Sequence, residues 1–383
     1  MEYSKEPAFI NRKDEFDFLE KWIQERPEHI LFLYGPKSSG KTTLINRFIE
    51  ASDKQKMEFR VLNLREIFIS GYGDFIKAFF GINPKGEKKE VKVTTEYGVK
   101  LFRLKREILN GLENKTLDPF QVMKKELEKL NEKGKRPVLI LDELQALEDI
   151  YLNGQRLLIK ELFNFFVAMT KESHLCHILI CGSDGYFMER IYNDSRLRKT
   201  SNFFKVDYLT KKNVMRWLDN LEKESNIRSY TLDETQKEET WNMFGGSMWE
   251  ISNFLGDLIL YPADGKIPNK AFLELIKKKK IQMRSHFAEY AGLSRNRQNL
   301  CFAMDNEIKN KDFFVLDDFG HLIDPENFAD EFLLREELRG LVSNNFIAYD
   351  PVTAQYSTQG KSMEHGLRMY NEMRKTDKGN KEK

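Results

Sequence analysis

The sequence of 383 residues has no long apolar segment, few cysteines and almost no net charge. No apolar run approaches the ~20 residues that a helix needs to span a bilayer. The first residues lack the basic and then apolar pattern of a secretory signal. Three cysteines without a CxxC pair favour neither a disulfide framework nor a zinc site, so we expect a cytoplasmic protein with no membrane partner.

What the sequence does contain is an alternation of short apolar runs and amphipathic segments up to about residue 208. This alternation is typical of an α/β module with a parallel sheet and helices on both faces. The expected strands are Ile30–Tyr34, Phe59–Leu64, Val138–Leu141, His177–Cys181 and Phe203–Tyr208. The expected helices cover 9–25, 41–51, 118–133 and 153–171.

The chain is too long for a single core, and its second half reads differently. Residues 209–290 are predominantly helical and predict a lid domain. Residues 291–373 combine helices with a hairpin around the turn Asp350-Pro351 and predict a winged-helix module. We expect a disordered tail over 374–383, which is short, polar and highly charged.

A phosphate-binding loop follows the first expected strand. The segment from Gly35 to Thr42 fits GxxxxGK[ST] and opens a helix, as the motif requires. The glycines let backbone N–H groups point at a phosphate, while Lys41 reaches the β- and γ-phosphates and Thr42 ligates Mg²⁺. A glycine- and serine-rich turn with a surface lysine is the alternative. The expected ATP-binding residues here are Gly35, Pro36, Lys37, Ser38, Ser39, Gly40, Lys41, Thr42 and Thr43.

A pair of carboxylates ends the expected strand Val138–Leu141. In a parallel sheet Asp142 would lie at the carboxyl edge, where ligands of α/β proteins bind. We expect Asp142 to hold Mg²⁺ and Glu143 to act as general base on water. In the alternative interpretation, Asp142 caps the next helix and Glu143 belongs to its first turn.

Three further polar residues are catalytic candidates. Ser183 follows the strand His177–Cys181 and is expected to touch the γ-phosphate or the attacking water, or else to cap the next helix within a tight turn. Arg196 and Arg198 precede the last strand and could stabilise the transferred phosphoryl group, in cis or on a neighbouring subunit. Surface salt bridges are the alternative for both arginines.

Together these motifs resemble the archaeal ATPases of the AAA+/STAND branch of P-loop NTPases. Phe9 to Glu15, with Leu19, is similar to the FxGRxxEL box of that family, with Asn11 in place of glycine. The resemblance implies that this segment, including Phe9 and Arg12, lies over the adenine and ribose. Gly245 to Trp249 is similar to the Gly-Gly-x-Pro lid motif, but Met248 replaces the proline, so we expect the contact between lid and nucleotide to differ from that of the family.

The charges of the second half are distributed unevenly. Residues 266–297 carry nine Lys or Arg against two Glu, a local charge of +7, whereas residues 305–337 carry a local −8. A winged helix that reads DNA normally presents a basic helix, so an acidic one favours a protein partner. Lys277–Lys280 remains a candidate DNA contact, with a solvated helix end as the alternative.

The sequence thus predicts an AAA+-like P-loop fold with a helical lid and a C-terminal winged helix. The predicted activity is Mg²⁺-dependent hydrolysis of ATP to ADP and phosphate, in a regulatory switch or slow motor that has a protein partner or self-associates. The alternative is an ATP-gated nucleic-acid-binding protein that uses 266–297 and the basic insertion 85–106. Phosphoryl transfer to a small molecule is disfavoured, because Glu143 beside Asp142 favours water as the acceptor.

Overall fold

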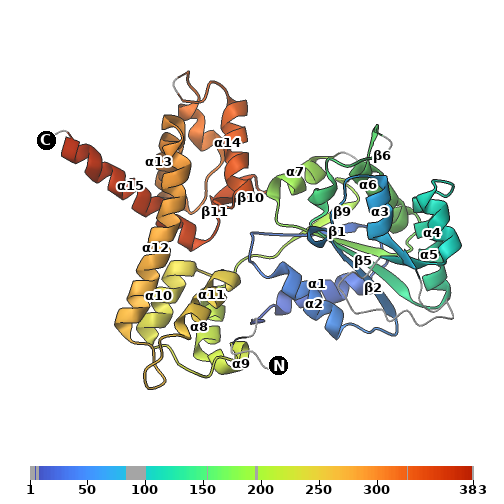
Figure 1. Cartoon of the computed structure of the whole chain (residues 1–383), viewed down its shortest axis with the longest axis horizontal. Helices are drawn as coiled ribbons and strands as arrows, with labels where there is room; N and C mark the ends of the chain where they lie inside the picture. The colour runs from blue at the N-terminus through green and yellow to red at the C-terminus, as the bar shows by residue number, and fades with distance from the viewer. Residues whose placement is uncertain are drawn as a thin grey trace.

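A computed structural model describes residues 5, 8–82, 101–152, 154–194, 197–325 and 327–381. Of the expected basic insertion 85–106, only 101–106 lies within these residues. Figure 1 shows the α/β module on one side and the helical second half on the other. No helix among the described residues is long and apolar enough to cross a membrane.

A five-stranded parallel sheet forms the centre of the α/β module, in the order β2-β5-β8-β1-β9. Its strands are β1 (Ile30–Tyr34), β2 (Met57–Asn63), β5 (Arg136–Asp142), β8 (His177–Cys181) and β9 (Ser201–Lys205). The expected strands 30–34 and 177–181 are therefore confirmed at both ends. Because β8 pairs with β1 on one side and β5 on the other, the polar residues after β1, β5 and β8 meet at one sheet edge.

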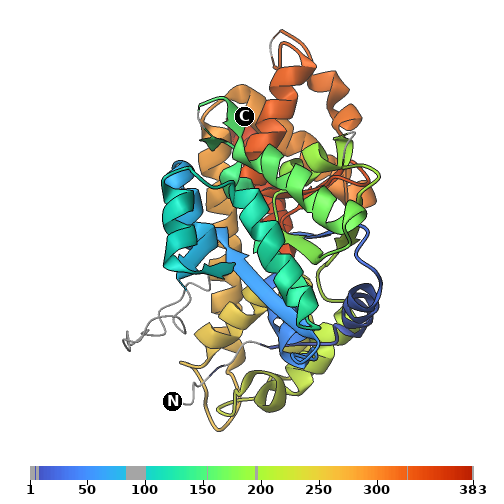
Figure 2. The same ribbon diagram turned by 90° about the vertical axis from the view of Figure 1, so that its right-hand side faces the viewer.

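Alternate residues of the central strands pack into two cores, one on each face of the sheet. Phe32 and Ile178 belong to one core and their neighbours Leu33 and Leu179 to the other. Both faces are covered by helices, which explains why these strands are apolar throughout instead of alternating. Figure 2 views the molecule from the side of this module and shows helices in front of the sheet.

The helices of the module divide between the two faces. One core contains residues of α1 (Lys13–Gln24) and α2 (Lys41–Ala51). The other contains residues of α3 (Tyr72–Phe79), α4 (Arg106–Glu113), α5 (Pro119–Glu132), α6 (Leu158–Val167) and α7 (Gly185–Asn193). Two short strand pairs complete the module, β3 (Phe80–Ile82) with β4 (Phe102–Leu104) and β6 (Tyr151–Leu152) with β7 (Arg156–Leu157).

The lid is a separate helical core. Its helices are α8 (Lys211–Asp219), α9 (Leu221–Ser225), α10 (Glu234–Phe244), α11 (Met248–Leu258) and the first half of α12 (Asn269–Gly292). Trp217 is fully buried here. Trp249, in the first turn of α11, is 63% exposed.

The winged helix contains α13 (Arg295–Lys311), α14 (Glu331–Ser343), the hairpin β10 (Ile347–Asp350) and β11 (Gln355–Thr358), and α15 (Lys361–Lys381). The helix α12 crosses the expected domain boundary: Phe272 belongs to the lid core and Phe287 to the winged-helix core. The tail expected to be disordered is helical as far as Lys381. The helix α15 is nucleated where it packs on α12, and adding further residues to a helix that already exists costs little free energy.

Candidate active site

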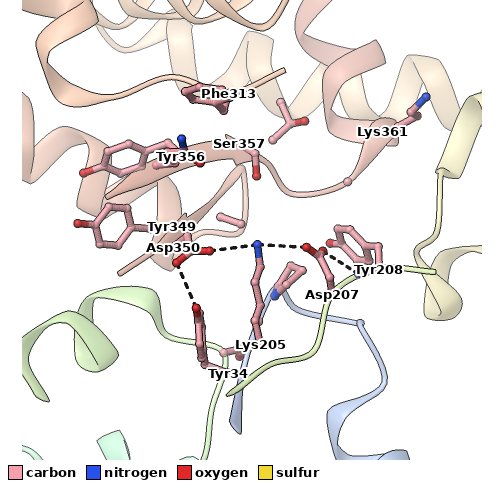
Figure 3. A pocket seen from close by; sticks show the side chains of 17 residues that line it. Tyr34, Lys205, Asp207, Tyr208, Phe313, Tyr349, Asp350, Tyr356, Ser357 and Lys361 are labelled. Atoms are coloured by element: carbon pink, nitrogen blue, oxygen red, sulfur yellow. Dashed lines mark hydrogen bonds and ion pairs between the residues drawn. The ribbon is translucent and has the colours of Figure 1, made fainter. Parts of the chain in front are cut away.

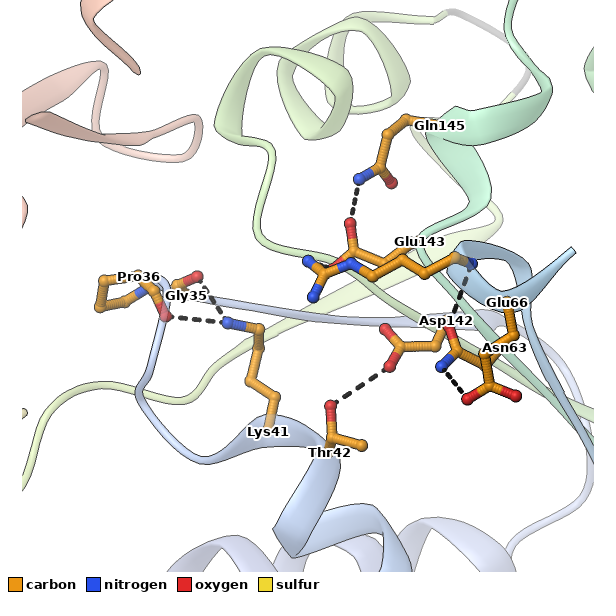
Figure 4. Close-up of polar contacts among 10 residues, drawn as sticks. Gly35, Pro36, Lys41, Thr42, Asn63, Glu66, Asp142, Glu143 and Gln145 are labelled. Carbon is orange, nitrogen blue, oxygen red and sulfur yellow. Dashed lines mark hydrogen bonds and ion pairs between the residues drawn. The ribbon is translucent and has the colours of Figure 1, made fainter. Parts of the chain in front are cut away.

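The phosphate-binding loop connects β1 to α2, as the motif requires. Its lysine, Lys41, is 8% exposed and donates hydrogen bonds to the carbonyl oxygens of Gly35 (2.9 Å) and Pro36 (2.8 Å), as Figure 4 shows. Burial lowers the pKa of Lys41. The ammonium is thus already inside the loop, where phosphate oxygens could replace the two carbonyls.

The two motif glycines are required by geometry. Gly35 has φ +145°, and a Cβ there would lie 2.2 Å from the carbonyl oxygen of Val206. Gly40 has φ +92°, and a Cβ there would lie 3.1 Å from the sulfur of Met248. Only glycine adopts these backbone conformations at little cost. Met248, in the place of the lid proline, therefore packs directly on the phosphate-binding loop.

The oxygens of Thr42 and Asp142 meet at the edge of the sheet. The Thr42 hydroxyl donates to Oδ2 of Asp142 across 3.2 Å, and Asp142 is 9% exposed. A hydroxyl and a carboxylate are the hard oxygen donors that Mg²⁺ prefers, and Mg²⁺ commonly takes only one or two protein ligands beside water and phosphate. The pair fits a magnesium ion bound together with a nucleotide.

Glu143 lies beside this pair in a constrained environment. Its φ of 60° is unusual for a residue other than glycine. The carboxylate accepts hydrogen bonds from the guanidinium of Arg65 and the side-chain amide of Gln145. Burial raises the pKa of Glu143, and the charge of Arg65 opposes that rise. The capping alternative is not observed: Asp142 is the last residue of β5 and accepts from Thr42, and the short helix begins only at Leu144, after Glu143.

A cleft of about 410 Å³ opens over these groups. At one end it is polar and includes Lys41, Thr42, Asp142 and Glu143. At the other it is formed by the lid and the N-terminal segment. The remaining lining residues are Lys5, Ala8, Lys37, Ser38, Gly40, Thr43, Arg65, Ser183, Trp217, Met248, Trp249 and Ser252. A polar end and a more apolar end match the two halves of a nucleotide.

The family described as an ATPase domain predominantly from Archaea matches residues 9–254. The chain belongs to this archaeal ATPase family. A related ATP-binding protein of Methanocaldococcus jannaschii is 40% identical over 212 residues, which cover 54% of this chain and 58% of that protein. Another from the same organism is 36% identical over 285 residues, covering 70% of this chain and 78% of that one.

The overall fold of the archaeal ATPase is AAA+. The ORC2 protein of Aeropyrum pernix, solved in ADPNP-ADP complexes, matches with a TM-score of 0.54 over 97% of this chain and 96% of that one. The identity is 10%, so the likeness shows the fold alone. That fold is a P-loop α/β core with a helical lid and a C-terminal winged helix, as the sequence predicted.

Several expected nucleotide-binding residues of the archaeal ATPase do not line the cleft. Arg12 is 6% exposed and donates to the carbonyl oxygens of Ser39 and of Asp207, the latter at 2.9 Å. Phe9 packs edge to face on Phe16, with ring centroids 6.0 Å apart. Arg12 therefore contacts the loop through the Ser39 carbonyl, whereas Phe9 packs on α1. Ser39 is buried, and Gly35 and Pro36 line a neighbouring cavity instead.

Ser183 lines both the cleft and that neighbouring cavity. The cap of α7 is Asp184, whose side chain accepts from the Phe187 amide at 3.0 Å, so the capping alternative for Ser183 is not observed. Arg198 is exposed in the turn before β9 and does not line the cleft. Arg196 lies outside the described residues.

Sequence reasoning missed Arg65 and Gln145. Arg65 follows β2, and β2 lies beside β5 with Asn63 opposite Asp142. That strand order brings Arg65 to Glu143 from 78 residues away. The order was not predicted, but a polar Asn-Leu-Arg-Glu sequence directly after an apolar strand was a signal that this end reaches a site. Gln145 could have been noticed two residues after Glu143.

Proposed function

We propose that this archaeal ATPase binds Mg·ATP in the cleft and hydrolyses it to ADP and phosphate. The observation that carries the proposal is the convergence of Lys41, the Thr42–Asp142 pair and Glu143 at one sheet edge. The names of the relatives, which are ATP-binding proteins, support nucleotide binding. The complexes of the Aeropyrum pernix protein with ADPNP and ADP support the same type of ligand.

Each polar side chain has a defined part in this proposal. Mg²⁺, held by Thr42 and Asp142 through oxygen, would neutralise charge on the phosphates. Lys41 exchanges its two loop carbonyls for phosphate oxygens. Glu143 accepts a proton from water as the water oxygen bonds to the γ-phosphorus and the bond from phosphorus to the bridging oxygen breaks, with the electron pair going to ADP.

In this mechanism Glu143 must change partners before it can act. Each oxygen of its carboxylate already accepts a hydrogen bond, one from Arg65 and the other from Gln145. Arg65 is 56% exposed, so its side chain can move into solvent at small cost. We infer that the ion pair is a resting arrangement that slows hydrolysis until Arg65 turns away.

We further propose that hydrolysis serves a nucleotide-controlled regulatory switch or slow motor. The lid touches the loop through Met248, and the winged helix is docked on the core through the ion pair between Lys205 and Asp350 (3.1 Å). We therefore expect a change of nucleotide in the cleft to alter the contacts of both the lid and the winged helix. The acidic segment 305–337 favours a protein partner or a second copy over nucleic acid.

The second candidate function is ATP-gated binding of nucleic acid. It is favoured by Lys277 and Lys278, which are exposed on α12. The acidic segment does not neutralise them: Lys279 pairs with Asp257 of the lid at 3.0 Å, and the acidic residues Asp305 and Asp318 pair with lysines of α13. Lys277 and Lys278 are therefore exposed while the winged helix is docked on the core.

Replacement of the loop lysine tests nucleotide binding directly. Lys41→Ala should abolish measurable binding of Mg·ATP while the melting temperature changes little, because the ammonium serves the phosphates and not the core. Isothermal titration with a non-hydrolysable ATP analogue measures the affinity. An unchanged affinity in a folded Lys41→Ala protein would exclude this cleft as the ATP site.

A further inference from the structure

The carbonyl group of Lys37, in the phosphate-binding loop, is held from outside the loop. It accepts a hydrogen bond from the hydroxyl of Tyr208 at 3.1 Å and another from Nε2 of Gln359 at 3.3 Å. The two donors are also bonded to each other, at 3.3 Å. Tyr208 lies where the core joins the lid, and Gln359 lies between β11 and α15 of the winged helix. All three modules therefore meet at one backbone oxygen.

The direction of this carbonyl matters because of peptide geometry. The carbonyl of Lys37 and the N–H of Ser38 belong to one peptide group, and no cis peptide occurs among the described residues. In a trans peptide the two groups point in opposite directions. Holding the carbonyl toward Tyr208 and Gln359 therefore turns the Ser38 N–H the other way. N–H groups of such a loop form the phosphate cradle.

Ser38 also has a backbone conformation that needs support. Its φ is +68°, in the left-handed region that residues with a Cβ seldom adopt. Such a conformation is strained and persists only where the surroundings of the residue fix it. The two hydrogen bonds to the preceding carbonyl supply that fixation. Burial raises the pKa of Tyr208, so its hydroxyl stays a donor at all physiological pH values.

The position of Gln359 depends on the docking of the winged helix. Its backbone N–H donates to the carbonyl of Phe346 at 3.0 Å, which ties it to the hairpin. The hairpin in turn is attached to the core by Asp350, which pairs with Lys205 at 3.1 Å and accepts from the Tyr34 hydroxyl at 3.3 Å. Figure 3 shows Lys205 between Asp350 and Asp207 in the cavity under the hairpin.

A second contact is made by Tyr349, the residue directly before Asp350 on β10. The Tyr349 hydroxyl donates to Glu189 of α7 at 2.6 Å, and the ring of Tyr349 stacks on Tyr186 with centroids 4.8 Å apart. The helix α7 begins two residues after Ser183. The hairpin therefore contacts the core beside the phosphate-binding loop, through Tyr34, and on α7, through Glu189. A displacement of the hairpin would move Gln359 away from the Lys37 carbonyl.

We propose that Gln359 is a positioning residue for the phosphate-binding loop, so that the docked winged helix is a working part of the nucleotide site. Gln359 does not touch the nucleotide. It acts with Tyr208 through the Lys37 carbonyl and keeps the Ser38 N–H aimed at the phosphates. Undocking of the winged helix therefore weakens nucleotide binding, and binding in turn favours the docked state. This inference rests on the proposed function of the cleft as an ATP site.

The test is the affinity of the full chain for a fluorescent ATP analogue with Mg²⁺. Gln359→Met keeps the length of the side chain and removes the donor, and it should raise Kd about 3- to 10-fold, the value of one neutral hydrogen bond. Gln355→Met makes the same change on β11 away from Lys37 and should leave Kd unchanged. In steady-state hydrolysis Gln359→Met should raise KM while kcat stays within about twofold, because the catalytic groups are intact.

Two further variants separate positioning from general damage to the fold. Tyr208→Phe combined with Gln359→Met should raise Kd by less than the product of the single effects, because both donors share one acceptor. Asp350→Asn weakens the docking contact and should raise Kd in the same direction, although it lies away from the loop. An unchanged Kd for Asp350→Asn would refute the dependence on docking.

Failure of this inference and failure of the proposed function give different results. A wild-type chain that binds no analogue overturns both. A wild-type chain that binds, with Gln359→Met binding equally well at an unchanged melting temperature, overturns the positioning role alone. A fall of kcat and melting temperature together, with KM unchanged, would assign Gln359 to the stability of the winged helix instead.

Discussion

Arg65, at the end of β2, forms an ion pair with Glu143, at the end of β5. The guanidinium is 56% exposed and the carboxylate 9% exposed, so a mobile cation holds a fixed, buried base. If the pair is a resting arrangement, Arg65→Ala should increase the rate of ATP hydrolysis about two- to fivefold, in keeping with the small energy of a partly exposed pair. Arg47→Ala removes an equally exposed arginine from a surface pair with Glu50 and serves as the control. A large fall in kcat for Arg65→Ala would instead give Arg65 a direct catalytic part.

The pH dependence of the same variant is a second prediction. Glu143 must be ionised to accept a proton, so hydrolysis should fall as the pH is lowered through its pKa, which burial has raised above the ordinary glutamate value. The charge of Arg65 favours the ionised form. Its removal should therefore raise the pKa further and move the acid limb of the kcat profile to higher pH. A limb that moves to lower pH, or not at all, would argue against Glu143 as the titrating group.

Glu143→Gln separates binding from chemistry. The amide keeps the size of the side chain but cannot accept a proton, so turnover should fall about a hundredfold or more while Mg·ATP still binds. Asp142→Asn should instead raise the Mg²⁺ concentration needed for half-maximal activity. Hydrolysis by Glu143→Gln at the wild-type rate would mean that the base is another residue.

The arginines before β9 predict an effect of protein concentration. Arg198 is exposed and does not line the cleft of its own chain, so a catalytic role for it would require a neighbouring subunit. Activity per chain should then rise with concentration, and a mixture of Arg198→Ala and Lys41→Ala chains should recover some hydrolysis. The same mixture made with Arg196→Ala tests the other arginine. A rate independent of concentration, without recovery in either mixture, would leave no role in trans.

The nucleic-acid candidate predicts binding that is weak, independent of sequence and sensitive to salt. Lys277–Lys280 with Arg284 could engage four to six phosphates, so log K should fall against log salt with a slope of about −4 to −5. Replacement of the four lysines by glutamine should abolish the binding. The same change at Lys124, Lys125, Lys129 and Lys133, at α5, removes equal charge elsewhere and is the control. Absence of binding at low salt with and without ATP would leave the switch with a protein partner as the better account.

The motifs could be predicted from the sequence because chemistry fixes both their residues and their spacing. Lys41, Thr42 and Asp142 come together as expected, and the strands that deliver them are apolar throughout because they are buried on both faces. The contacts of Glu143 could not be predicted. The polar sequence after β2 indicated that this end reaches a site, but the pairing of Arg65 with Glu143 follows from the order of strands in the sheet, which depends on tertiary packing.

Local geometry explains the remaining differences. Helical spacing predicted a helix from residue 153, but the chain first forms the hairpin of β6 and β7, with Gly154 at φ +73°, and α6 begins only at Leu158. The resemblance to the family's N-terminal box placed Arg12 over the nucleotide. Its guanidinium instead donates hydrogen bonds to backbone carbonyl oxygens. A sequence pattern gives the position of such a residue in the chain but not the atoms that its side chain meets.

The helix α12 has a mechanical consequence. Its 24 residues extend about 36 Å, and its two ends are embedded in the cores of different modules. The helix α15 lies along it, which stiffens the connection. Lid and winged helix are thereby joined by one stiff helix, so we expect a tilt of the lid to be transmitted to the docking contacts of the winged helix. A tilt of α12 by a few degrees at its lid end displaces its other end by ångströms. The loss of one phosphate from the cleft could therefore change the position of the winged helix.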